Sequence, residues 1–338
     1  MKNYNRNNRN NRSDWRNWSF IALISLLCFS SCSEEFEPEI DEPDVLVINV
    51  LAQPDSLVWA SVSHSWVFND SNNWQSVIVP DATAECSVND GEWLPMTFDE
   101  ENERYVASYR PVSGDRIRVR AHSQKYGDAE GRTEIPVAVP IDSWSYTIES
   151  HVDNNGFIFE GGTFYHPIMA TVRYKIVFTD PAANDNYYLV NGSVSSTYGY
   201  NWELDDPIIS ENESNIDGVF NKYHYATFFS DNTIKGQTYT LSLYTEHTIN
   251  SYGVDYGRYT TDSLALFTIS RDYYLYLLSL SKKYNGLQGS LEEFGMADPH
   301  NVFCNVSPGK GIVASCAPSV IVNDLYDELM QIYSDNYE

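Results

Sequence analysis

Few residues in this chain have the types and spacing that catalysis requires. Neither a Gly-x-Ser-x-Gly elbow nor a His-Glu-x-x-His pair occurs, which argues against the hydrolases and zinc enzymes that carry these motifs. Gly309-Lys310-Gly311 lacks the earlier Gly and the following Ser or Thr of a phosphate-binding loop, so we interpret it as a hairpin turn. The seven histidines are scattered rather than paired at metal-ligand spacing: His64, His122, His151, His166, His224, His247 and His300. The sequence therefore predicts a protein that is not an enzyme.

A cation site has only weak support in the sequence. Glu213, Asn215 and Asp217 alternate before Gly218, as oxygen ligands do at the start of a calcium loop. The twelfth position of such a loop is His224 instead of Glu, so a solvated acidic turn is the simpler interpretation. We expect no metal ion and no other cofactor, with calcium as the weak alternative.

Cys32 is the residue with the clearest chemical role. Five basic residues precede an apolar run over 18–29, which is too short to span a membrane as a helix. Small residues precede Cys32 and acidic residues follow it. The pattern predicts a bacterial lipoprotein signal peptide over 1–31, acylation of Cys32 with chains such as palmitate, and an acidic tether over 32–43. An ordinary secretory signal and an uncleaved anchor are the alternatives.

The charge of the chain restricts its partners. The 338 residues have a formal net charge of −26, and the first 31 contain five Lys or Arg against one Asp, so the remainder carries −30. Such an acidic surface argues against nucleic acid or anionic lipid as a partner. Hydrophobic residues make up 42% of the chain, which is too much for a disordered protein. The part after the signal peptide should therefore fold.

Two cysteines could form a disulfide in an oxidising compartment. Cys304 and Cys316 flank the turn at Gly309, and paired strands on either side of it would bring the thiols together. The alternative is a pair of buried free thiols.

Aromatic residues crowd part of the second half of the chain. Tyrosine occurs 25 times, and its side chain offers contact area at a low entropic cost. Five aromatic residues near Gly and Asn are candidate contacts for a glycan or a peptide: Tyr198, Tyr200, Trp202, Tyr252 and Tyr256. The alternative for each is strand propensity and core packing.

These residues must be positioned by a mainly β fold. Residues 44–140 predict an immunoglobulin-like or transthyretin-like β-sandwich, because short β-rich runs alternate with turn residues. The runs lie at 45–50, 57–62, 83–88, 104–109 and 116–121. Pro136 and Pro140 border the exit from this domain, since a proline resists sheet pairing.

A second antiparallel β domain is predicted over 141–322. Its clearest strand runs are 170–178, 186–190, 237–244 and 263–269. It contains a predicted helix over 270–284, because Ser270 can cap the N-terminus and apolar residues recur at helical spacing. A further helix is predicted at the C-terminus, over 323–338.

Several segments resemble a family of bacteroidete lipoproteins that carry domain of unknown function 4249. The segments are Phe178-Thr179-Asp180-Pro181, Asn186-Tyr187-Tyr188, Phe229-Ser230-Asp231, the run from Ile269 to Leu277, and the run from Pro299 to Val306 with Gly309-Lys310-Gly311. The part up to the exit at 136–140 follows the first domain of that family, and it is also similar to the sandwich of carboxypeptidase-regulatory-like domains. The chain departs from the family pattern at Cys304, where the family usually has Ser.

The resemblance implies a lipid-anchored protein of the outer membrane that faces the cell exterior. It also implies, by association, a TonB-dependent outer-membrane transporter as partner, with this chain as a ligand-binding or accessory subunit in nutrient uptake. A purely structural surface protein and a hydrolase with paired carboxylates are the alternatives. The ligand does not follow from the sequence.

Overall fold

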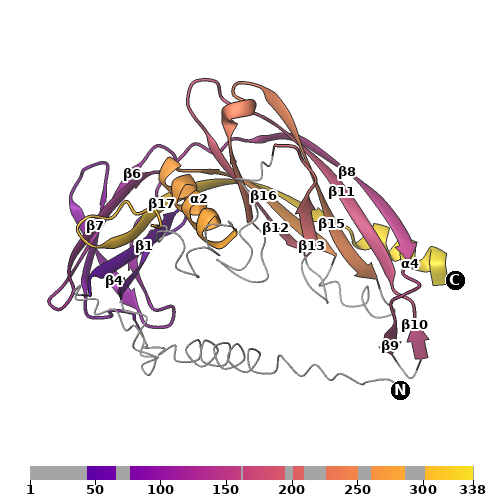
Figure 1. Cartoon of the computed structure of the whole chain (residues 1–338), viewed down its shortest axis with the longest axis horizontal. Helices are drawn as coiled ribbons and strands as arrows, with labels where there is room; N and C mark the ends of the chain where they lie inside the picture. Colours follow the sequence, from indigo (N-terminus) through magenta and orange to yellow (C-terminus); the bar gives the residue numbers. More distant parts are fainter. Residues whose placement is uncertain are drawn as a thin grey trace, which may run out of the picture. The chain divides into compact units, whose positions relative to one another are not determined.

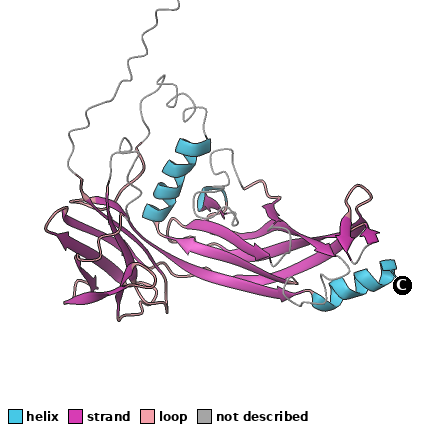
Figure 2. Ribbon diagram, turned by 90° about the horizontal axis from the view of Figure 1, so that it is seen from below, coloured by secondary structure: helices cyan, strands magenta, loops and turns pink. Residues whose placement is uncertain are grey.

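A computed structural model of the chain describes residues 44–65, 77–160, 163–194, 201–208, 226–249, 260–285 and 301–337. These residues all belong to one compact unit. Strands make up most of them, and the two α-helices within these ranges, α2 (Arg271–Asn285) and α4 (Tyr326–Tyr337), are seen in Figure 2. The predicted fold class, mainly β with one or two helices, is confirmed.

The first seven strands form a curled, sandwich-like sheet around one hydrophobic core (Figure 1). Alternate residues point inward, as in the first strand, where Leu46, Ile48 and Val50 are buried and their neighbours are partly exposed. The last of the seven strands lies beside residue 307, and the Ser307 N–H donates to the Glu130 carbonyl of this strand over 2.8 Å. The strands are β1 (Leu46–Ala52), β2 (Trp59–His64), β3 (Thr83–Val88), β4 (Trp93–Asp99), β5 (Arg104–Ala107), β6 (Arg116–Ser123) and β7 (Gly127–Glu134).

The following strands build two sheets that face each other across a second core. A four-stranded antiparallel sheet has the order β13-β15-β11-β8, and it packs on a part of the larger sheet with the order β14-β12-β16-β17. Leu325 and Leu329, at the start of α4, extend this core. The elements are β8 (Ile141–Val152), β9 (Ile158–Glu160), β10 (Thr163–Tyr165), β11 (Ile168–Thr179), β12 (Tyr187–Val194), β13 (Asn201–Leu204), β14 (Ala226–Ser230), η1 (Asp231–Thr233), β15 (Thr238–Ile249), β16 (Thr261–Ile269) and β17 (Lys310–Asp324).

Helix α2 covers the other face of β12, β16 and β17 and forms a third core with them. It is the helix predicted over 270–284, and the Ser270 hydroxyl accepts a hydrogen bond from the Tyr273 N–H over 3.4 Å, as a capping residue does. Leu277 and Tyr273 point toward Ile312 and Cys316 of β17. The chain thus builds three layers around β16 and β17: the four-stranded sheet, the larger sheet and α2.

Strand β17 joins the two parts of the chain and corrects two predictions. It pairs in parallel with β1 and antiparallel with β16, so it is the shared strand of an eleven-stranded sheet. The hairpin predicted at Gly309 is wrong, because this bend leads directly into β17 rather than back along a preceding strand. The C-terminal helix begins at Tyr326 instead of residue 323, because Asn323 and Asp324 still pair with β16.

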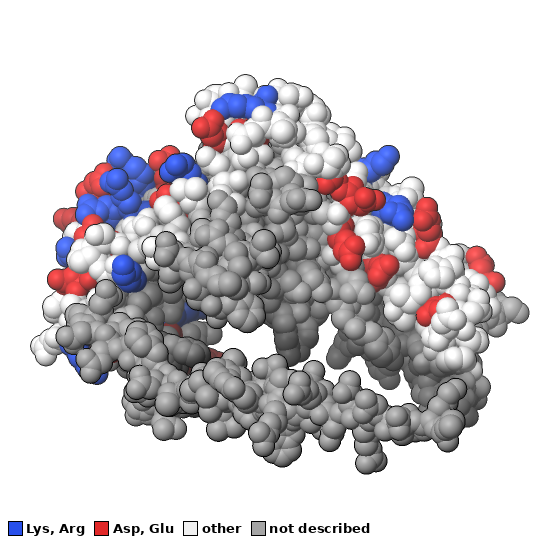
Figure 3. Space-filling model, in the orientation of Figure 1, with Lys and Arg blue, Asp and Glu red and all other residues white. Residues whose placement is uncertain are grey.

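Charged side chains on the curled sheet form pairs between neighbouring strands. Figure 3 shows basic and acidic residues mixed over this part, so its surface does not carry charges of a single sign. Arg118 lies 2.5 Å from Glu130, and Arg120 lies 2.6 Å from Glu85. Both guanidinium groups also stand over Trp93, at 5.1 and 4.0 Å from its ring. Exposed pairs of this kind stabilise a fold only slightly, so we interpret them as surface structure.

Candidate functional site

Most of the predicted site residues lie outside the described residues. This holds for Cys32, for Tyr198, Tyr200, Tyr252 and Tyr256, and for the calcium-like stretch at 213–224. Their roles stay predictions. Within the described ranges, no three His, Cys, Asp or Glu side chains are grouped so that they could hold a metal ion. The helices of the same ranges include none with the length and apolar character needed to cross a membrane.

Trp202 is a core residue, so its prediction as a ligand contact is wrong. Its side chain is only 1% exposed and packs between the two sheets of the second core. It lies against Gly192, where an added Cβ would come within 3.0 Å of the indole ring. Strand β13 is paired with β15, so Trp202 stands beside Thr245. Core packing, the alternative interpretation of this residue, is therefore the correct one.

The disulfide that the sequence left open between Cys304 and Cys316 is not formed, and both are free thiols. Cys304 is exposed in the segment before β17, whereas Cys316 is buried under α2, so they do not lie on paired strands. Burial raises the pKa of Cys316 to about 12 and that of Cys86 to about 11. These two buried thiols are therefore poor nucleophiles at neutral pH.

Several residues that carry the family resemblance hold loops together at one end of the second core. Buried Asp180 accepts hydrogen bonds from the Tyr188 hydroxyl at 2.5 Å, the Asn186 side chain at 3.1 Å and the Gly236 N–H at 2.8 Å. Asp231 accepts another from the Asn186 N–H at 2.9 Å. Burial, together with the Asp180 carboxylate, raises the pKa of Tyr188, which keeps this hydroxyl a donor. These residues have a structural role.

A second group of resembling residues fastens α2 to β17. Asn305 donates to the Asp272 carboxylate at 2.8 Å and to the Val313 carbonyl at 2.9 Å, and it accepts from the Val313 N–H at 2.9 Å. The Ser270 hydroxyl accepts from the Ser315 N–H at 3.2 Å. Buried polar groups need such partners, so these positions are explained by the fold alone.

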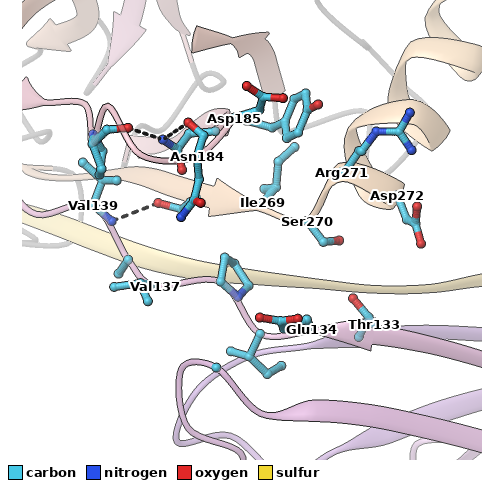
Figure 4. A pocket seen from close by; sticks show the side chains of 18 of the residues that line it. Thr133, Glu134, Val137, Val139, Asn184, Asp185, Ile269, Ser270, Arg271 and Asp272 are labelled. Carbon is cyan, nitrogen blue, oxygen red and sulfur yellow. Dashed lines mark hydrogen bonds between the residues drawn. The ribbon is translucent and has the colours of Figure 1, made fainter. Parts of the chain in front are cut away.

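A pocket of about 760 Å³ opens between these two groups, and we call it the strap pocket (Figure 4). Its wall is the strap, residues 135–140, which runs from β7 toward β8. The segment 181–187 and the turn 268–272, where β16 leads into α2, supply the other walls. Three segments far apart in sequence thus meet around one concave surface.

The strap is anchored at both ends and open in the middle. The Ile135 N–H donates to the Asp115 carbonyl at 2.8 Å, and the Val139 N–H donates to the Thr268 hydroxyl at 2.9 Å. Between them, Val137 is 71% exposed, and neither its backbone nor that of Ala138 has a hydrogen-bond partner among the described residues. The middle of the strap can therefore contact a bound molecule without any rearrangement of the sheet.

Charged groups line the pocket beside this apolar surface. Asp185 forms an ion pair with Lys235, and this hydrogen-bonded partner lowers the pKa of the Asp185 carboxyl group. Glu134 and Arg271 are exposed, and neither forms a salt bridge within the part of the chain that the structure describes. The pocket thus combines apolar surface with a few polar groups, which suits binding. The sequence did not predict this site. The available signals were the two prolines that border the strap and the family resemblance of the segments near 181–187 and 268–272.

A buried polar network occupies the second core, away from the strap pocket. Fully buried Asp262 accepts hydrogen bonds from the Tyr174 hydroxyl at 2.6 Å and from Thr245 at 2.8 Å. His247 Nε2 lies 3.0 Å from the other Asp262 oxygen, and Asn323 donates to the Tyr174 hydroxyl at 2.9 Å. Burial, followed by the charge of Asp262, raises the pKa of Tyr174. Residue types of a catalytic triad are present, but solvent does not reach them, so we interpret the network as structural.

The fold is that of a mainly β protein, and the strap pocket is a concave surface between three of its segments. The family model for a domain of unknown function, DUF4249, matches residues 33–320, and the chain belongs to this family. No curated protein matches the chain. Among solved structures, the chain is similar to a protein from Corynebacterium diphtheriae described as a candidate membrane-anchored protein, at 12% identity and a TM-score of 0.18. The match covers 68% of this chain and 55% of that one, so the chain spans little more than half of its length.

Proposed function

We propose that the protein is a surface-facing lipoprotein of the outer membrane that binds a ligand or partner segment in the strap pocket. In this proposal it serves a TonB-dependent nutrient transporter as a ligand-binding or accessory subunit. The observation that supports this proposal most directly is the strap pocket. Its volume of about 760 Å³ lies within the range of ligand sites, and it is lined by segments that carry the family resemblance. Bacteroidete origin and the likeness of the first part to carboxypeptidase-regulatory-like domains belong to the same proposal.

The resembling residues around the pocket divide into two kinds. Asp180, Asn186 and Asp272 are engaged in hydrogen bonds that hold the loops, so the fold accounts for them. Val137 and Arg271 are exposed at the pocket and are not needed to hold any of these contacts. Val137 and Arg271 therefore contribute little to the stability of the fold. Their position at a concave surface favours a role in binding.

Replacing Val137 by Asp should reduce binding of the transporter at least tenfold. A carboxylate in the apolar middle of the strap would have to lose water when a partner covers it, and that cost is not repaid. Co-purification from detergent-solubilised membranes, measured by quantitative immunoblot, checks the result. Val322→Asp is the control, because Val322 is also well exposed but does not line the strap pocket. Equal recovery of the transporter with both variants would contradict the proposed site.

Replacing Cys32 by Ala should abolish incorporation of labelled palmitate into the protein. The acyl chains would be attached at this residue, and a chain without them would lose stable membrane anchoring. Labelling in the native host, followed by immunoprecipitation, is the measurement. Cys304→Ala should keep the label, because Cys304 is an exposed cysteine of the folded part. Label that persists without Cys32 would refute the anchor.

Two other functions are less well supported. A purely structural surface protein would share the anchor, but its Val137→Asp variant would behave as the unchanged chain does in every binding assay. A hydrolase with paired carboxylates would need two free acids across the pocket. Of the three acids that line it, Asp185 is paired with Lys235 and Asp272 is bonded to Asn305, so Glu134 is left without a matching partner.

A further inference from the structure

A short hairpin prolongs the antiparallel pair of β8 and β11. Pairing of β8 with β11 ends at Val152 and Ile168, and β9 and β10 continue beyond it as a separate two-stranded sheet (Figure 1). Within this hairpin, Phe159 stands opposite Phe164 in the register. Cross-strand neighbours of this kind lie on the same face of a sheet.

Three phenylalanines of the hairpin are exposed together, and we call them the phenylalanine tip. Phe157, Phe159 and Phe164 are 65%, 64% and 68% exposed. The Phe164 ring lies beside both others, with centroids 4.8 Å apart for Phe159 and Phe164 and 6.4 Å apart for Phe157 and Phe164. Single exposed apolar residues are common, but a contiguous aromatic group marks an interaction surface.

The base of the hairpin holds the phenylalanine tip in place. His166 Nδ1 donates to the Gly156 carbonyl at 3.0 Å, and the His166 ring lies 4.8 Å from that of Phe157. The Asp153 N–H donates to the Pro167 carbonyl at 2.8 Å. An aromatic surface that is already ordered loses little conformational entropy when a partner covers it.

Charge distinguishes between the surfaces that could cover the tip. The hairpin and its base, residues 150–168, contain no Lys or Arg in the sequence, while they contain two acidic residues, Asp153 and Glu160. Anionic lipid would be repelled by this segment, whereas Lys and Arg around an apolar pocket would attract it. We infer that the phenylalanine tip docks into an apolar pocket bordered by basic residues on a protein partner. This inference depends neither on the lipid anchor nor on the strap pocket.

Photo-crosslinking tests the inference in the full chain. A benzophenone amino acid at position 159, expressed in the native host, should give one discrete protein adduct, and the same probe at Val112, another exposed position, should not. The adduct should fall at least fivefold in the double variant Phe157→Ser and Phe164→Ser. It should also fall severalfold when a whole-cell lysate is labelled at 0.5 M instead of 0.05 M NaCl, because salt screens exposed charges. Mass spectrometry of the adduct should map the contact next to Lys or Arg.

Several results would overturn the inference. Adducts with lipid alone, or with a second copy of this chain, would assign the tip to a membrane or to self-association. An adduct that does not depend on salt, or no adduct at all, would contradict a protein partner with basic residues around its pocket. Flotation with vesicles of phosphatidylcholine and phosphatidylglycerol gives an independent readout, in which the non-acylated chain and the double variant should stay equally unbound. The variants should keep the wild-type melting temperature, because the replaced side chains are mostly in solvent.

Discussion

The Asp262→Ala variant is expected to lose about 3–5 kcal/mol of unfolding free energy, because several buried polar groups would lose their shared acceptor. Asp262 is fully buried and receives the Tyr174 and Thr245 hydroxyls, with His247 Nε2 at 3.0 Å. Removing the carboxylate leaves these donors in the core without their acceptor, and each such group costs about 1–3 kcal/mol. Urea unfolding at neutral pH, followed by tryptophan fluorescence, measures the loss.

Asp205→Ala provides the matched control for this experiment. Asp205 is an acid in the same part of the fold, but its side chain is 75% exposed and its contact with Arg173 is 3.9 Å long. Exposed pairs contribute about 0–1 kcal/mol, so this variant should remain close to wild type. Should both variants lose the same small amount, the buried network would not stabilise the second core as its geometry indicates.

The Gly311→Ala variant is expected to lose about 3 kcal/mol or more, because β17 approaches β1 closely at this position. A Cβ on residue 311 would lie 2.0 Å from the carbonyl oxygen of Ile48, which is backbone and cannot turn aside. The residue also has a φ of +117°, which is strained for any side chain. Overpacking and backbone strain each cost about 1–3 kcal/mol, so the parallel pairing of β1 with β17 should weaken sharply. The shift in the urea midpoint at unchanged slope measures the effect.

Gly114→Ala separates the two causes. Gly114 has a φ of +88°, but nothing lies within 4 Å of an added Cβ. This variant should show the backbone strain alone, about 1–2 kcal/mol. A loss at Gly311 no larger than at Gly114 would mean that β17 and β1 are farther apart than the structure has them.

The local parts of the fold follow from the sequence. Residues 83–88 are predicted and observed as one strand, and α2 follows the predicted range within one or two residues. Alternating apolar residues and the capping hydroxyl of Ser270 act between near neighbours in the chain, so one sequence window contains their causes. The same is true of the mainly β class.

The predictions that failed depend on distant pairing. Trp202 has the composition of an exposed aromatic segment, but β13 pairs with β15 and turns it into the core. Gly309-Lys310-Gly311 has the composition of a turn, but the segment enters a strand that lies beside β1, more than 250 residues earlier in the chain. Neither partner can be identified from the residues around these positions.

Sequence alone determined the mainly β class, the positions of most strands and of α2, the acidic charge, and the prediction of Cys32 as an anchor. Alternation and capping depend on near neighbours in the chain, and net charge is a sum over residues, so all three can be predicted from the sequence. Only the tertiary structure decided that β17 joins two sheets, that Trp202 and Cys316 are buried, and that the strap meets 181–187 and 268–272 around a pocket. Pairings between distant strands fix these features, because a strand can satisfy its backbone hydrogen bonds with many partners and packing chooses among them.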